Sequence, residues 1–145
     1  AEVWMSLVHG SLGIVYFAHE WEPKFVEAGL LADAQMSAAV ADINRQILVL
    51  APVLNSPTVA DGVAVSSSAP EFPVDALAKQ YRGDTYIFAV GMRLGETQAT
   101  FQIAGLEGET RAEVIDEGRE IIVSDGRFTD DFAAYDAHLY RIPRP

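Results

Sequence analysis

The start of the chain combines a helical apolar pattern with one short run that is apolar throughout. In Glu2–His9 the apolar side chains recur at helical spacing, and Gly10 is a suitable residue to end a helix. Gly13–Ala18 contains apolar residues without polar alternation, which is typical of a strand buried on both faces in a parallel sheet. The polar residues 19–23 follow this run, and we expect them to form a loop at the carboxyl end of the strand.

A longer helical pattern follows the loop. From Ala34 to Leu50 apolar residues recur on one face, and Asp33 is well suited to cap the first turn. We expect Pro52 to end this helix, because the residue before a proline disfavours the helical conformation. Residues 1–57 are therefore predicted to form a helix–strand–helix segment.

From Thr58 onward the apolar positions recur with a period of two, and glycine and aspartate separate the runs. This alternation predicts half-buried strands, and Arg82-Gly83-Asp84 is predicted to join two of them as a hairpin. About seven short strands with regular turns are typical of an antiparallel β-sandwich, which we assign to residues 58–145. The predicted strands lie near Val63–Val65, Asp75–Tyr81, Thr85–Val90, Gln98–Ile103, Ala112–Asp116, Glu120–Val123 and Tyr135–Ile142.

Charge and composition exclude several classes of function. The chain has 10 basic and 21 acidic residues, which gives a net charge of −11. A duplex nucleic-acid partner requires a basic surface, and an anionic membrane would repel this chain, so we expect neither partner. The chain has no cysteine and therefore no disulfide or thiolate metal site. No apolar run reaches about 18 residues, so we predict no transmembrane helix. We expect no cofactor, and the sequence leaves the cellular compartment open.

The apolar run 13–18 requires neighbours that the rest of the chain does not offer. A parallel strand satisfies its backbone groups only beside other parallel strands, and the downstream strands are predicted to be antiparallel. We therefore expect the missing neighbours to belong to a preceding segment, or the run to be covered by the sandwich or by a second copy in a homo-oligomer.

Several segments together resemble the C-terminal region of retaining TIM-barrel glycoside hydrolases. Residues 8–17, Val-His-Gly-Ser-Leu-Gly-Ile-Val-Tyr-Phe, resemble the last barrel strand and its preceding helix. Residues 43–47 and 50–54 resemble the final barrel helix and its exit. Residues 128–132 and 135–141 resemble the end of the β-sandwich domain that follows the barrel.

The resemblance implies a mainly β C-terminal fragment. Its antiparallel sandwich would follow a helix–strand–helix remnant of a (β/α)8 barrel, and 145 residues are too few for a whole barrel of about 250. The catalytic carboxylates of such enzymes lie on earlier strands, so we expect no catalytic pair here and no activity from this chain alone. In the family an aromatic residue after the last strand often forms a sugar platform. We therefore assign substrate binding to Trp21, together with its neighbours Glu20 and His19.

Other chemistry at the same loop has simpler interpretations. Glu20 and Glu22 flank Trp21 and could form the carboxylate pair of a glycosidase, but an ordinary acidic loop is the favoured interpretation. His9, His19 and Glu20 contain metal-binding atoms, but their spacing matches no compact motif.

Two further groups lie in the predicted sandwich. His138, Asp136 and Ser124 could be combined into a catalytic triad, but there is no nucleophile elbow, and a packing role for the histidine is favoured. Asp130 and Asp131 are adjacent carboxylates, but without further oxygen ligands they do not form a calcium loop.

A different class of function is the alternative to the fragment. The chain could be a self-standing module that binds carbohydrate or a protein, with the N-terminal segment packed on the sandwich and aromatic side chains as the contacts. It could also form oligomers through exposed apolar surface.

Overall fold

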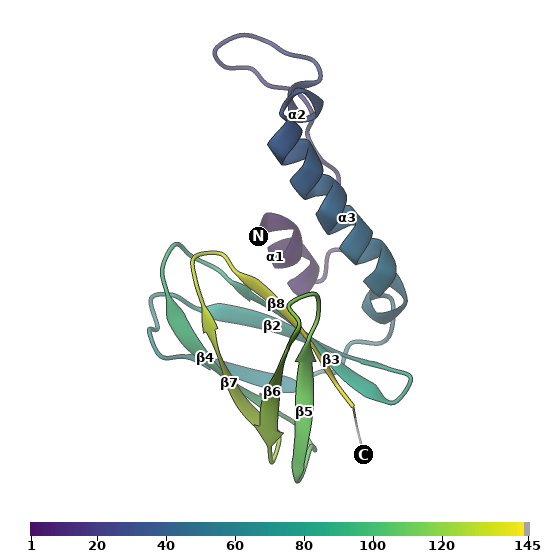
Figure 1. Ribbon diagram of the computed structural model, residues 1–145, viewed down its shortest axis with the longest axis vertical. Coiled ribbons are helices and arrows are strands. Elements are labelled where there is room, and N and C mark those ends of the chain that lie inside the picture. The colour runs from purple at the N-terminus through teal and green to yellow at the C-terminus, as the bar shows by residue number, and fades with distance from the viewer. Residues whose placement is uncertain (144–145) are drawn as a thin grey trace. The chain divides into compact units, whose positions relative to one another are not determined.

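The computed structural model describes residues 1–143 (Figure 1). The chain divides into two compact units. One unit joins Ala1–Leu12 to the chain from Ser56 onward, and the other is Gly13–Asn55.

The larger unit is a single antiparallel sheet of eight strands. The predicted mainly β architecture, with a helical N-terminal segment, is confirmed. The strands are β1 (Val63–Ser67), β2 (Val74–Tyr81), β3 (Asp84–Gly91), β4 (Thr97–Ile103), β5 (Glu109–Val114), β6 (Arg119–Ser124), β7 (Arg127–Phe132) and β8 (Ala137–Ile142).

The sheet curls until it nearly closes. Its strand order is β1-β4-β7-β6-β5-β8-β3-β2, and the two edge strands β1 and β2 approach each other. Every strand pair in the described residues is antiparallel. Figure 1 shows the facing halves of the curled sheet, which enclose the core as the two layers of a sandwich do.

Alternate residues of the strands point inward and form one apolar core. Phe101 of β4 lies at its centre, with its ring stacked on Phe128 at 4.6 Å between centroids and 7° between planes. Phe132 and Tyr140 also contact the Phe101 ring. These four aromatic residues are at most 3% exposed, because alternate side chains of each strand face the core.

The first helix covers part of the outer face of the sheet. Helix α1 (Glu2–Val8) contacts β3 and β2, and Trp4 stacks on Phe88 with 5.6 Å between ring centroids. Trp4 is 4% exposed, so this contact is buried. Gly10 follows the helix with a φ of +92°, a conformation that suits glycine, so the predicted stop is also confirmed.

The predicted hairpin forms, and one strand was not predicted. Arg82 and Gly83 connect β2 to β3 with φ angles of +53° and +91°, as a two-residue turn of positive φ requires. Strand β7 was missed because Asp130 and Asp131 are typical turn residues. Its inward positions are nevertheless Phe128, Asp130 and Phe132, so the strand does alternate, with a carboxylate at one inward position.

The smaller unit contains α2 (Gly29–Ala32) and α3 (Ala34–Leu54). Asp33 caps α3 as predicted, since its Oδ1 accepts a hydrogen bond from the Met36 N–H at 2.9 Å. The prediction that Pro52 ends the helix was wrong, because α3 continues to Leu54. Pro52 has no N–H and so lacks one backbone bond, but the last turn still forms, since the Asn55 N–H bonds to the Ala51 carbonyl at 2.9 Å.

Helix α3 has a further property that the length of the apolar runs did not predict. Its 21 residues are long and apolar enough to cross a membrane, by length and composition only. Core helices of soluble proteins and signal sequences share this property, so it does not by itself indicate a membrane.

The prediction of a buried strand over residues 13–18 was wrong. These residues lie outside every strand that the structure describes. The exposure of their side chains alternates: Val15 is 96% and Phe17 is 68% exposed, while the other set, which includes Tyr16, is half-buried. The Tyr16 hydroxyl donates to Asn44 Oδ1 of α3 at 2.8 Å. The segment lacks a ladder because a parallel strand needs neighbouring parallel strands, and residues 1–143 supply none.

Candidate functional site

The three predicted substrate-binding residues lie in a closed loop of the smaller unit. Glu20 and Val26 exchange two backbone hydrogen bonds, at 3.0 Å from the Glu20 N–H and 2.8 Å from the Val26 N–H. A third bond runs from the Leu30 N–H to the Ala18 carbonyl at 3.0 Å. Three backbone bonds therefore hold the base of the loop, and Trp21 lies immediately beyond the pair Glu20–Val26.

Four aromatic rings gather in residues 17–25, which we call the aromatic loop. The centroid distances are 4.9 Å from Trp21 to Phe25, 5.6 Å from Phe25 to His19 and 5.3 Å from His19 to Phe17. Trp21 is 65% exposed and Phe25 is 53% exposed. Large apolar rings grouped in an exposed cluster are typical of an interaction surface.

The chemistry of the aromatic loop suits a ligand with both apolar and hydroxyl groups. Aromatic faces can cover the C–H face of a sugar ring, and carboxylates accept hydrogen bonds from hydroxyls. The structure brings His19 and Trp21 together around Phe25, while Glu20 and Glu22 are exposed on either side of Trp21. The assignment of substrate binding to these residues stays a prediction.

Gly29 allows the loop to close, and its replacement is our first prediction. A Cβ at Gly29 would lie 2.6 Å from Glu20 Cβ and 3.1 Å from the Glu20 nitrogen. We expect Gly29→Ala to push Glu20 away from Val26 and to speed amide hydrogen exchange of both residues about fivefold to tenfold. Gly13→Ala is the control, because a Cβ there would meet nothing within 4 Å. Unchanged exchange in Gly29→Ala would show that the pair does not depend on this close approach.

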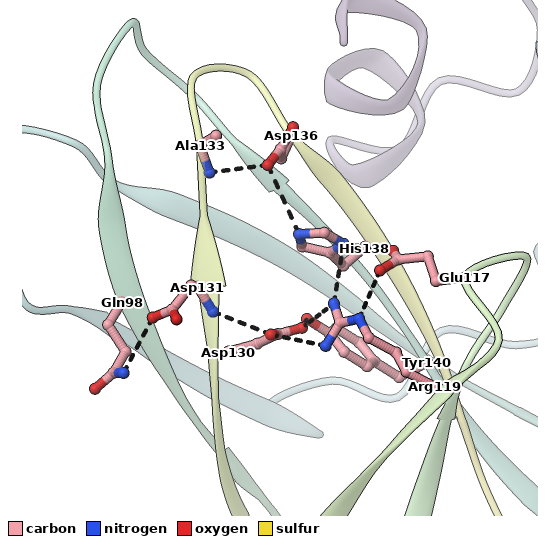
Figure 2. Close-up of polar contacts among 9 residues, drawn as sticks. All are labelled: Gln98, Glu117, Arg119, Asp130, Asp131, Ala133, Asp136, His138 and Tyr140. Atoms are coloured by element: carbon pink, nitrogen blue, oxygen red, sulfur yellow. Dashed lines mark hydrogen bonds and ion pairs between the residues drawn. The ribbon is translucent and has the colours of Figure 1, made fainter.

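A second group of polar residues lies at one end of the sheet interior. We call Glu117, Arg119, Asp130, His138 and Tyr140 the ion cluster (Figure 2). Arg119 donates two hydrogen bonds to Asp130, at 2.9 and 2.7 Å, and a third to Glu117 at 2.7 Å. The Tyr140 hydroxyl donates to Asp130 Oδ2 at 2.9 Å. Nδ1 of His138 lies 2.5 Å from Glu117 Oε1.

The ion cluster joins three strands and one turn. Arg119 begins β6, Asp130 lies in β7, His138 and Tyr140 lie in β8, and Glu117 lies in the turn between β5 and β6. Each strand residue occupies an inward position of its strand. Paired charges can be tolerated there because the bidentate arginine and the tyrosine satisfy the aspartate oxygens.

The contacts shift the ionisation of the cluster. Burial alone would raise the pKa of Asp130, but the hydrogen bonds from Arg119 and Tyr140, with the arginine charge, outweigh burial and lower this pKa. Burial and the Asp130 charge raise the pKa of the Tyr140 hydroxyl, so it stays protonated. The hydrogen bond to Asp130 raises the pKa of Arg119. Asp130 and Arg119 are therefore a fixed ion pair at neutral pH, beside a protonated Tyr140.

The ion cluster replaces two weaker interpretations from the sequence. Asp130 and Asp131 do not act together, because adjacent strand residues point to opposite faces, and Asp131 instead accepts from Gln98 Nε2 at 3.0 Å on the outer face. His138 lies 3.9 Å from Asp136. Ser124 is five residues along β6 from Arg119, about 16 Å at the rise of a strand, so a triad with His138 does not form.

The remaining histidine, His9, lies next to a carboxylate. His9 Nε2 lies 3.0 Å from Asp75 Oδ2, and both side chains are exposed. Among residues 1–143 no group of three or more histidine, aspartate or glutamate side chains could hold a metal ion.

Comparison with known proteins identifies structures of similar fold. No protein-family model and no curated protein sequence matches the chain. A crystal structure of an Anoxybacillus α-amylase, which gave insight into a new glycosyl hydrolase subclass, matches with a TM-score of 0.54 and 12% identity. The match covers 78% of this chain and 23% of that chain.

A second structure leads to the same result. A variant of AmyP in complex with maltotriose matches with a TM-score of 0.53 and 13% identity, over 84% of this chain and 24% of that chain. At these identities the likeness shows a shared fold. This chain spans less than a quarter of the length of either protein.

Proposed function

We propose that the chain is the C-terminal part of a glycoside hydrolase related in fold to the α-amylases. The observation that carries the proposal is the match to a small part of two such chains, over most of this chain. The eight-stranded sheet would be the domain that follows the catalytic barrel and braces it. No catalytic carboxylate pair is assigned to this chain.

The smaller unit supports the proposal through residues 13–18. In residues 13–18 the Tyr16 hydroxyl bonds to Asn44 of α3, while Val15 and Phe17 are exposed. We expect this pattern of a barrel strand that contacts the following helix, here α3, but lacks the neighbouring strands of its sheet. We propose that preceding barrel strands pair with residues 13–18 and cover Val15 and Phe17.

The fragment proposal is tested by activity and by the coding sequence. We expect the purified chain to hydrolyse neither starch nor aryl glucosides, because the catalytic carboxylates lie elsewhere. Upstream coding sequence for about 200 residues of alternating strands and helices would support the proposal. Hydrolysis by the chain alone, or an upstream sequence of another class, would contradict it.

We further propose that Trp21, with His19 and Glu20, contacts the sugar at the carboxyl end of residues 13–18. The exposure of Trp21 favours this role, and ligands of open α/β and barrel sheets bind at the carboxyl ends of strands. The same exposure favours the second candidate function, a module that binds carbohydrate without a barrel.

Binding of maltotriose tests the role of Trp21. We expect Trp21→Ala to weaken binding at least about tenfold, since base or ring stacking on an aromatic side chain contributes about 1–3 kcal/mol. Tyr135→Ala is the control, because Tyr135 is 44% exposed but lies in the larger unit. Binding by the isolated chain that depends on Trp21 would favour the self-standing module. Equal affinity of the wild type and Trp21→Ala for maltotriose would show that Trp21 does not take part in binding.

A further inference from the structure

The register of the aromatic loop places Trp21 opposite Phe25. Because Glu20 and Val26 are paired in antiparallel fashion, the next residues along the two arms are Trp21 and Phe25. Residues directly opposite in such a pair have side chains on the same face. The ring centroids of Trp21 and Phe25 are 4.9 Å apart with 49° between planes, as expected for opposed aromatic residues.

The Phe25 ring lies between those of Trp21 and His19. Its backbone is next to Val26, whose N–H and carbonyl both bond to Glu20. Its ring also contacts His19 at 5.6 Å, and His19 contacts Phe17. Among the residues that the structure describes, the ring in contact with Trp21 is that of Phe25.

We propose that Phe25 is a positioning residue, which holds the Trp21 ring in one orientation so that its free face is ready to receive the C–H face of a pyranose ring. Phe25 acts through Trp21 and has no need to contact the sugar. The part of this inference that concerns sugar rests on the proposed function of Trp21. An indole that is already ordered loses less side-chain freedom on binding, which raises affinity without a new contact.

The motion of the Trp21 indole tests the positioning directly. The chain has two tryptophans, so two indole N–H signals are expected in a nitrogen-15 NMR spectrum, and Trp21→Phe identifies the one that belongs to Trp21. We expect Phe25→Ala to lower the order parameter of this N–H to below about 0.6, and Phe25→Tyr to restore the wild-type value. Phe17→Ala is the matched control, because Phe17 is an exposed ring of the same loop that contacts His19.

Maltotriose affinity provides the second readout. We expect Phe25→Ala to weaken binding about threefold to tenfold, and Phe25→Tyr and Phe17→Ala to leave it within twofold. An indole that stays ordered in Phe25→Ala would overturn the positioning role. An indole that becomes mobile in Phe25→Ala, in a chain whose wild type binds no maltotriose, would uphold the positioning role and refute the sugar role of Trp21. The amide signals of α3, which belongs to the same unit as the aromatic loop, report whether that unit is folded in each variant.

Discussion

Phe101→Ala is expected to lower the free energy of unfolding by about 3–5 kcal/mol. Phe101 is fully buried, and its ring contacts those of Phe128, Phe132 and Tyr140. Loss of the ring removes its transfer free energy and leaves a cavity between the facing halves of the sheet. The surrounding aromatic rings cannot refill that cavity, because Phe128 and Phe132 are held in β7 and Tyr140 in β8. The measurement is urea unfolding followed by far-ultraviolet circular dichroism.

Two further variants, a control and a milder substitution, test this prediction. Thr100→Ala, one residue earlier on the outer face of β4, is expected to change stability by less than about 0.5 kcal/mol. If Phe101→Ala does not fold, Phe101→Leu should fold with a loss of about 1–2 kcal/mol. If Phe101→Leu were as stable as the wild type, the Phe101 ring would not contribute to stability as predicted.

Asp130→Ala is expected to cost about 3 kcal/mol, the second largest effect. The side chain of Asp130 is 10% exposed and accepts hydrogen bonds from Arg119 and Tyr140. Its removal leaves a guanidinium and a buried hydroxyl without their acceptor. Asp131→Ala is the matched control, because Asp131 is the next residue and lies exposed on the outer face. Similar losses in both variants would contradict a special role for the ion cluster.

The same aspartate gives a dependence on pH with a definite sign. The pKa of Asp130 is lowered in the folded protein, so its ionised form favours folding. This contribution is complete above the pKa of an unfolded aspartate, about 4, and is lost as the pH falls through the lower folded pKa. Asp130→Asn cannot titrate at this position. The difference in stability between wild type and Asp130→Asn should therefore stay constant from pH 7 to pH 5 and shrink below about pH 4. A constant difference down to pH 2 would contradict the lowered pKa.

Local patterns in the sequence predicted most of the strands and helices. The period of two in residues such as 85–90 has a direct structural meaning, because alternate side chains of a strand point to opposite faces. Asp33 and the turn Arg82-Gly83 were predictable for a similar reason, since each satisfies a local backbone requirement. Strand β7 was missed because the composition of residues 130–131 indicates a turn, while their alternation fits a strand.

The candidate sites were predicted only in part. The sequence singled out Trp21 because it follows the segment that resembles the last barrel strand, where the family often has an aromatic sugar platform, but it gave no reason to choose Phe25. That contact depends on the pairing of Glu20 with Val26, which no local pattern indicates. The ion cluster was missed because its members come from residues 117–140 and meet only when β6, β7 and β8 curl around one core. A carboxylate at an inward position between Phe128 and Phe132 was the one available signal.

The sequence by itself determined the mainly β fold, the places of most elements, the acidic surface and the exclusion of thiolate chemistry. These properties depend on composition or on near neighbours along the chain. The tertiary structure decided that residues 13–18 remain unpaired, that Asp130 is neutralised by Arg119, and that Trp21 lies against Phe25. Each of these depends on which distant segments become neighbours, and such contacts follow from the packing of the whole unit rather than from any local pattern.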